Sequence, residues 1–147
     1  MSILLDTNAL LRLAQPRHPD HISARETVRL LLEQDESVCV VPQNLYEFWS
    51  VATRPVEANG LGMSNTETRR ELQSIKHVFK LLRDERGILS GWEDLVFESD
   101  SKGKAAHDTR LVAAMHRHGL TELLTFNEAD FKRYSRMITI RTPQAVT

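Results

Sequence analysis

The amino-acid sequence predicts an α/β fold in which a central, mainly parallel five-stranded sheet carries helices on both faces. Short apolar runs alternate with longer segments whose apolar residues recur at helical spacing. No tight-turn signal joins two strands, because the one Asn-Gly pair, Asn59-Gly60, lies between expected helices. Strands that alternate with helices and lack hairpins are typical of a parallel sheet. The length of 147 residues suits one domain, residues 1–147, with a sizeable core.

The first half of the chain is expected to form two strands and four helices. The run at 38–41 is apolar on both faces, as in the middle of a parallel sheet. Pro16 ends the first helix and Pro42 starts the third. Ser64 and Glu67 have the spacing of a capping box at the start of the fourth helix. The expected strands are 3–5 and 38–41. The expected helices are 7–13, 43–54 and about 64–84, together with one that follows the loop at 15–19 and ends near residue 33.

The second half is expected to contain three strands and three helical segments. The run at 87–90 predicts a weak third strand. Gly119 suits the left-handed cap that ends a helix. The other expected strands are 123–126 and 137–140, and the expected helical segments are 92–101, 105–118 and a short turn at 128–133.

The composition is that of a soluble globular protein, with 41% hydrophobic and 27% charged residues. The net charge of -1 means that nucleic-acid contacts must come from a local basic patch. The single cysteine, Cys39, lies in an apolar run, which favours a small core residue in a reducing cytoplasm. Met1 leads directly into the first strand, so no signal peptide is expected, and no run approaches the ~18 apolar residues of a membrane span.

Polar residues follow the expected strands at or near their carboxyl ends. Asp6 comes directly after the first strand, Glu47 lies one turn into the helix after the second, and Asp108 lies in the first turn of the helix at 105–118. Asn127 and Asp130 follow the fourth strand. Ligands of open parallel sheets bind just outside the carboxyl ends of the strands, so these side chains can converge on one edge.

Carboxylates that converge repel one another unless a cation lies among them. An all-oxygen cluster suits Mg²⁺ or Mn²⁺, and magnesium with bound water suits phosphate chemistry. One cysteine and no His-x-x-x-His pattern count against zinc. Each residue also has a structural interpretation that the sequence leaves open: a helix cap for Asp6 and Asn127, dipole stabilisation for Asp108, and a solvated face for Glu47 and Asp130.

Four segments recur in a typical order along the chain, at 4–10, 44–49, 107–115 and 123–127. Together they resemble the PIN-domain family. The resemblance covers essentially the whole chain, and it is closest to VapC-type toxins, the ribonuclease halves of bacterial toxin–antitoxin pairs. The ordered set carries the resemblance, since "DTN" alone would be worthless.

The resemblance implies a Mg²⁺-dependent endoribonuclease, the toxin of a type II toxin–antitoxin system, that hydrolyses RNA with a metal-activated water. By the family pattern, Asp6, Glu47 and Asp108 are catalytic metal ligands, and Mn²⁺ is expected to substitute for Mg²⁺. PIN domains often carry a fourth acid where this chain has Asn127. That departure puts a second metal ion in question, or moves the ligand role to Asp130.

RNA binding calls for cations near the acidic edge, and phosphate contacts make binding salt-sensitive. Lys104 and Arg110 flank Asp108 and are the favoured contacts, with Arg12 a further candidate. Thr125 is expected to orient a neighbouring carboxylate by hydrogen bonding, at the substrate edge. For each basic residue, an ordinary surface position is the alternative.

The resemblance also implies two protein partners: a second copy in a homodimer, and a small antitoxin that covers the acidic edge. The helices at 43–54 and 64–84 are a candidate clamp for the antitoxin. Two other functions stay open. A catalytically silent PIN-like binding module fits the Asn127 departure. A haloacid-dehalogenase-like phosphatase fits less well, because it requires a second acid where this chain has Asn8.

Overall fold

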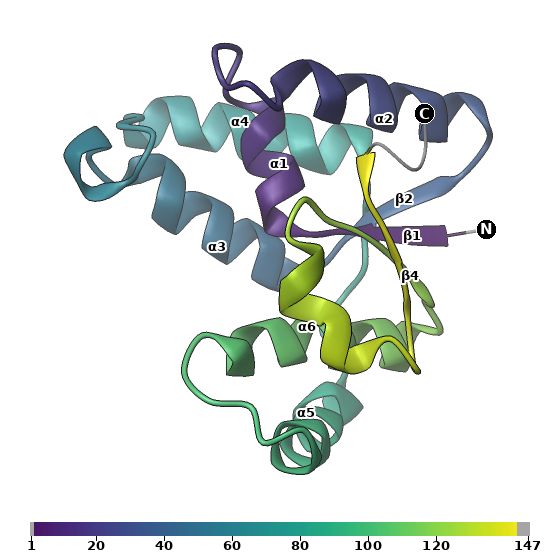
Figure 1. Cartoon of the computed structure of the whole chain (residues 1–147). Coiled ribbons are helices and arrows are strands. Elements are labelled where there is room, and N and C mark those ends of the chain that lie inside the picture. Colours follow the sequence, from purple (N-terminus) through teal and green to yellow (C-terminus); the bar gives the residue numbers. More distant parts are fainter. Residues whose placement is uncertain (1, 144–147) are drawn as a thin grey trace.

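The computed structural model describes residues 2–143 and has a five-stranded sheet at its centre (Figure 1). The strand order is β3-β2-β1-β4-β5, and every neighbouring pair is parallel, so the predicted fold class is confirmed. The strands are β1 (Ser2–Leu5), β2 (Ser37–Val40), β3 (Lys80–Leu81), β4 (Glu122–Leu124) and β5 (Thr139–Arg141).

Helical segments connect all the strands, and their ends follow the expected capping chemistry. Ser64 and Glu67 form a reciprocal capping box, and Gly119 ends its helix with a φ of 72°. Such caps satisfy polar groups that a helix end leaves without partners. The helices are α1 (Thr7–Leu13), α2 (His21–Glu33), α3 (Pro42–Thr53), α4 (Asn65–Val78), α5 (Arg86–Glu98) and α6 (Ala105–His118), with 3-10 helices η1 (Val56–Ala58) and η2 (Glu128–Tyr134).

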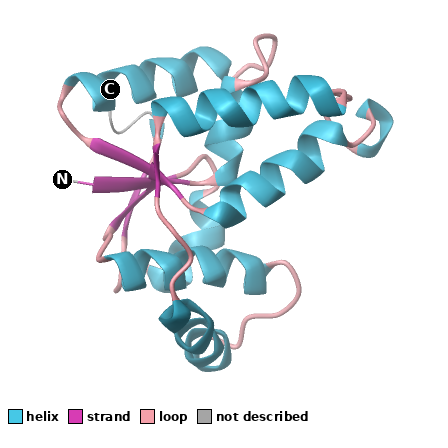
Figure 2. Ribbon diagram, turned by 180° about the vertical axis from the view of Figure 1, so that it is seen from behind, coloured by secondary structure: helices cyan, strands magenta, loops and turns pink. Residues whose placement is uncertain are grey.

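Alternate residues of the central strands separate two hydrophobic cores, one on each face of the sheet. Ile3 and Leu5 pack with α1, α2, α3 and α4 on one face. Leu4 and Cys39 pack with α5, α6 and η2 on the other. Figure 2 shows the two helical layers on opposite sides of the strands. The expected core position of Cys39 is confirmed, since its side chain is buried.

The chain order places a topological switch point between β1 and β4. From β1 the chain builds outward to β2 and β3, and it then returns to add β4 and β5 on the other side. Just beyond this junction, the backbone N–H of Asp6 donates to the Leu124 carbonyl at 2.9 Å. Open α/β sheets bind ligands at such points.

The predicted third strand is wrong. Residues 87–90 lie in α5, where Ile88, Trp92 and Leu95 recur at helical spacing and face the α6 side of the sheet. The actual β3 is the two-residue segment Lys80–Leu81. Both of its residues are exposed, so no apolar run marks it, and backbone pairing with Cys39 and Val40 holds it in place.

Two predicted helix boundaries also differ from the structure, because β3 and α5 occupy the segment between them. The predicted helix that ended at about residue 84 ends at Val78, because the chain turns there into β3. The predicted helix at 92–101 begins instead at Arg86. The strands at 123–126 and 137–140 shift by one or two residues at their ends, to Glu122–Leu124 and Thr139–Arg141.

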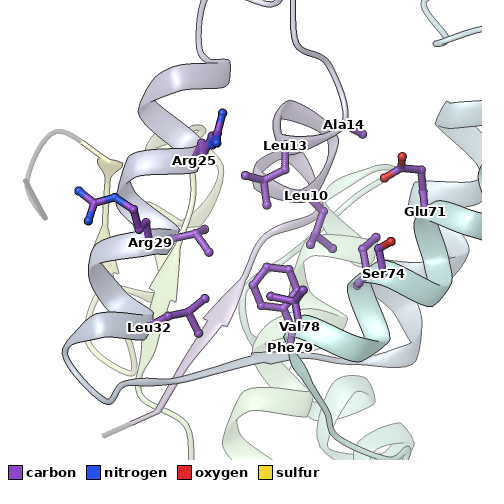
Figure 3. A pocket seen from close by; sticks show the side chains of 12 residues that line it. Leu10, Leu13, Ala14, Arg25, Arg29, Leu32, Glu71, Ser74, Val78 and Phe79 are labelled. Atoms are coloured by element: carbon purple, nitrogen blue, oxygen red, sulfur yellow. The ribbon is translucent and has the colours of Figure 1, made fainter.

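An apolar groove of about 340 Å³ runs along the outer side of α1, between α2 and α4 (Figure 3). Leu13, Leu32 and Val78 line it, and the last two are 40% and 50% exposed. Arg25, Arg29 and Glu71 stand among the lining side chains. Within residues 2–143, no helix is both long and apolar enough to cross a bilayer.

Candidate active site

A pocket of about 400 Å³ lies at the carboxyl end of β1. Asp6, Glu47 and Asp108 all line it, so three acids from separate parts of the sequence face one cavity. They come from the end of β1, from α3 and from the first turn of α6. The remaining lining residues are Thr7, Asn8, Leu11, Ser50, Val51, Arg54, Lys104 and His107.

The carboxyl group of Asp6 is the most deeply placed of the three. Only 6% of the residue is exposed, and its two oxygens accept hydrogen bonds from the Thr7 backbone N–H at 2.8 Å and the Thr125 hydroxyl at 2.7 Å. Burial raises its pKa to about 6, and the nearby carboxylates of Asp108 and Glu47 also raise it, while the two hydrogen bonds lower it. The Asp6 carboxyl group therefore sits among negative charges with little water.

Two neutral side chains hold the carboxylate of Glu47. Oε1 accepts a 2.6 Å hydrogen bond from the Thr7 hydroxyl, and Oε2 accepts a 3.2 Å bond from Gln43 Nε2. The Asn44 amide donates to Thr7 Oγ1 and to the Leu5 carbonyl, both at 3.1 Å. The first turn of α3 is thus tied to the end of β1, and this sets the place of Glu47.

Asp108 is half-buried beside a cation. The Lys104 ammonium group lies 3.9 Å from its carboxylate and 3.3 Å from that of Asp130. Burial raises the pKa of Asp108; Lys104 lowers it, and Asp130 and Glu47 raise it. Burial lowers the pKa of Lys104, but the Asp108 and Asp130 carboxylates outweigh this, so the net shift is upward. Lys104 thus compensates part of the negative charge of the pocket.

Five predicted site residues lie outside the pocket lining. Asn127 is exposed, and its backbone N–H donates to Thr125 Oγ1 at 2.9 Å. Asp130 is linked to the site by its ion pair with Lys104. Arg12 donates to Gln15 at 2.7 Å, and Arg110 lies between Gln43 and Asp84. The fifth is Thr125, which is buried behind the pocket and donates its hydroxyl hydrogen bond to Asp6.

Thr7, Gln43 and Asn44 are site residues that the sequence did not identify. Each binds a carboxylate of the pocket or the residue that positions it. The i,i+4 spacing of Gln43 and Glu47 on one helix face was the one local signal available. The contacts of Thr7 and Asn44 join the end of β1 and the start of α1 to α3, and they leave no local pattern.

The pocket suits a hard divalent cation in its chemistry. Asp6, Glu47 and Asp108 offer only oxygen donors, and burial raises the pKa of the Asp6 carboxyl, with a further upward contribution from Asp108 and Glu47. Among residues 2–143, however, no three acid, histidine or cysteine side chains are already assembled as a metal site. An ion ligated directly by all three acids would therefore require their side chains to move.

The sequence model of the PIN domain family matches residues 3–137. The chain belongs to the PIN domain family. The predicted resemblance is thereby confirmed, and the three acids lie at the switch point of a PIN domain sheet.

Solved structures similar to this PIN domain include a toxin–antitoxin complex from Klebsiella pneumoniae, which is 19% identical with a TM-score of 0.65, and covers 96% of this chain and 97% of its own. FitAcB from Neisseria gonorrhoeae is 18% identical with a TM-score of 0.70, and covers 97% of this chain and 98% of its own. VapBC2 from Rickettsia felis, bound to a DNA fragment from their promoter, is 15% identical with a TM-score of 0.69, and covers 97% and 98%. These identities establish a shared fold.

Another similar structure is Mycobacterium tuberculosis VapC20, described as a toxin that cleaves the sarcin-ricin loop. It is 16% identical with a TM-score of 0.66, and covers 93% of this chain and 96% of its own. The comparison with curated proteins gives no match.

Proposed function

We propose that this PIN domain is a Mg²⁺-dependent endoribonuclease and the toxin of a type II toxin–antitoxin system. The observation that carries the proposal is the convergence of Asp6, Glu47 and Asp108 on one pocket at the switch point. Structural similarity to a toxin described as cleaving the sarcin-ricin loop supports RNA as the substrate class.

Asp6, Glu47 and Asp108 would hold the metal ion, directly or through water. When bound, Mg²⁺, or Mn²⁺ in its place, supplies charge to polarise the scissile phosphate and to acidify a water. Thr125 and the Thr7 N–H hold Asp6 in position for this task. Glu47 would orient the attacking water or accept its proton. The water oxygen bonds to phosphorus as the P–O3′ bond breaks, and the leaving O3′ takes a proton from solvent, so that cleavage leaves a 5′-phosphate and a 3′-hydroxyl.

The fourth site group of this chain is Asn127 or Asp130. Asn127 would supply an oxygen without a charge, as a catalytic group beside Thr125. Asp130 would act as a metal ligand if Lys104 releases it, since the two are 3.3 Å apart. Calorimetric titration with Mn²⁺ measures how many ions bind to one chain. Only binding of a second ion would require Asn127 or Asp130 as a ligand.

Lys104, Arg110, Arg12 and Thr125 are the proposed substrate-side residues. Lys104 lines the pocket and is the cation best placed for the scissile phosphate. The side chain of Thr125 is fully buried and bonded to Asp6, so its part is to orient that carboxylate. Arg12 and Arg110 lie outside the lining and would contact flanking phosphates or act through neighbours.

We propose a small antitoxin and a second copy of the chain as partners. Similar structures include FitAcB and VapBC assemblies, which supports an antitoxin. The apolar groove among α1, α2 and α4 offers an amphipathic segment a surface, whereas the clamp expected from the sequence used α3 and α4 alone. A cytoplasmic location fits the free, buried thiol of Cys39.

The test is cleavage of RNA by the purified protein with Mg²⁺, with EDTA, and in the variants Asp6→Asn and Asp108→Asn. The matched control is Asp35→Asn, because Asp35 has a φ of 60° that asparagine adopts readily, and it lies in the α2–β2 turn. We expect the wild type and the control to cleave RNA with Mg²⁺. EDTA should abolish this cleavage, and both site variants should lack it.

Absence of RNA cleavage together with absence of Mn²⁺ binding by calorimetry would favour the silent binding module instead. Hydrolysis of a phosphomonoester through a phosphoaspartate would favour the phosphatase. Each result would contradict the proposed ribonuclease.

A further inference from the structure

Gln43 is a buried amide that joins the two helical layers at the edge of the acid pocket. Only 6% of the residue is exposed. Its Nε2 donates to Glu47 Oε2 at 3.2 Å and to the His107 carbonyl at 2.8 Å. Its Oε1 accepts from Arg110 Nη1 at 3.3 Å. Three of the four hydrogen-bonding positions of the amide are therefore used.

These partners fix which way the amide faces. A carboxylate and a carbonyl can only accept, so they require the NH₂ group. The guanidinium of Arg110 can only donate, so it requires the amide oxygen. A flipped amide would place oxygen against oxygen and NH₂ against a cation. Arg110 thus holds the amide in the orientation that binds Glu47.

Arg110 is itself held from the far side. Its Nη2 donates to the Asp84 carboxylate at 3.2 Å, in the segment between β3 and α5. Its two terminal nitrogens are therefore engaged with Asp84 and Gln43. A chain of side-chain contacts runs from Asp84 through Arg110 and Gln43 to Glu47.

Gln43 also bridges elements from opposite faces of the sheet. α3 packs in the core shared with α1, α2 and α4, and α6 packs in the core shared with α5. The His107 carbonyl that Gln43 binds belongs to the residue just before Asp108. One amide therefore contacts the Glu47 side chain and the turn of α6 that carries Asp108.

We propose that Gln43 is a positioning residue that sets the Glu47 carboxylate and its spacing to Asp108, and that Arg110 acts through Gln43. This inference rests on the proposed function and deepens it. Arg110 is then a support for the acid pocket, and Lys104 remains the cation that meets RNA phosphate. The alternative is that Arg110 contacts phosphate directly.

The first experiment compares Gln43→Met, which keeps the side-chain length and removes every hydrogen bond, with Gln43→Glu and the wild type. The matched control is Gln73→Met, at an exposed position of α4. For Gln43→Met we expect kcat to fall about tenfold or more, KM to stay within about twofold, and the Kd for Mn²⁺ without RNA to rise by about tenfold. Gln43→Glu should fail equally, because a second carboxylate repels Glu47.

Thermal unfolding of the same variants separates positioning from general damage. A Gln43→Met protein that unfolds near the wild-type temperature but binds Mn²⁺ weakly supports the proposal. Unchanged kcat and unchanged Mn²⁺ affinity in that variant would overturn it.

The second experiment is a double-mutant cycle with Gln43→Met and Arg110→Met. If Arg110 acts through Gln43, the double variant loses no more kcat/KM than Gln43→Met alone. RNA binding is also measured in EDTA at several salt concentrations. The slope of the logarithm of the binding constant against the logarithm of salt concentration should be unchanged in Arg110→Met and smaller in magnitude by about one in Lys104→Met. Additive losses, with a lower slope in Arg110→Met, would show a direct phosphate contact and overturn the proposal.

The Mn²⁺ measurement contains no RNA, so it tells the two proposals apart. A wild type that binds Mn²⁺ but cleaves no RNA contradicts the proposed function, while the Gln43 variants still decide the positioning role. A wild type that neither cleaves RNA nor binds Mn²⁺ overturns both.

Discussion

At the scale of single residues, the carboxyl group of Asp6 gives the pocket its electrostatic character. It is buried, it lies near Asp108 and Glu47, and its pKa is raised to about 6. An acid with a pKa raised in the folded state holds its proton more tightly there than in the unfolded chain. The folded protein therefore loses stability as pH rises through the interval from about 4 to 6.

The raised pKa of Asp6 predicts that Asp6→Asn stabilises the protein in the absence of metal. At pH 7.5 the variant should exceed the wild type in free energy of unfolding by up to about 3 kcal/mol, since one pKa unit corresponds to about 1.4 kcal/mol. The difference should shrink toward zero near pH 4, where the wild-type carboxyl is protonated. Urea unfolding with EDTA at several pH values measures it, and a difference independent of pH would contradict the assignment.

Thr7 provides a second prediction at this scale. Its hydroxyl donates to Glu47 and accepts from Asn44, so Thr7→Val removes a support of Glu47 and leaves the buried Asn44 amide short of a partner. We expect a loss of about 1–3 kcal/mol in unfolding free energy and a lower kcat for RNA cleavage. Thr7→Ser, which keeps the hydroxyl, should restore most of both. Equal behaviour of the valine and serine variants would count against this role.

The sequence predicted the acids but not the groups that hold them. Asp6, Glu47 and Asp108 each stand at a recognisable place relative to a strand or helix start. Gln43 and Asn44, by contrast, look like ordinary polar residues of a first helical turn. Their partners lie up to 67 residues away along the chain, so only the packing of α3 against β1 and α6 identifies them.

At the scale of elements, the segment from β3 to α5 shows where local patterns fail. A two-residue edge strand with exposed side chains buries too little to leave a hydrophobic signature. The run at 87–90 looked like a strand because two apolar residues stand together between glycine and serine. Tertiary packing of Ile88 against α6 decides in favour of a helix.

The helical assignment of this segment predicts the effect of Gly91→Ala. A Cβ at Gly91 meets no atom within 4 Å, and the position is inside α5. Alanine should therefore raise the free energy of unfolding by about 0.5–1 kcal/mol. Gly119→Ala should do the opposite, because Gly119 has a φ of 72°. Denaturant unfolding checks both, and a destabilised Gly91→Ala protein would contradict the α5 boundaries.

At the scale of the whole molecule, the order of the strands creates the site. Because β4 pairs with β1, the residues that directly follow these two strands lie side by side. Thr125 therefore donates a hydrogen bond to Asp6, 119 positions away along the chain. The alternation of elements predicted a parallel sheet, but no local pattern specifies that β1 lies at its centre. The sequence could therefore only lead us to expect that the acids converge, and the three-dimensional arrangement was needed to find them in one pocket.

The central claim is that these acids from distant parts of the chain hold one divalent ion. The most direct test is a crystal soaked with Mn²⁺ and measured at a wavelength where manganese scatters anomalously. We predict an anomalous peak in the pocket at the end of β1, ligated by Asp6 and Asp108, with Glu47 in contact directly or through water. A peak elsewhere, or an empty pocket at a concentration that supports RNA cleavage, would contradict the account.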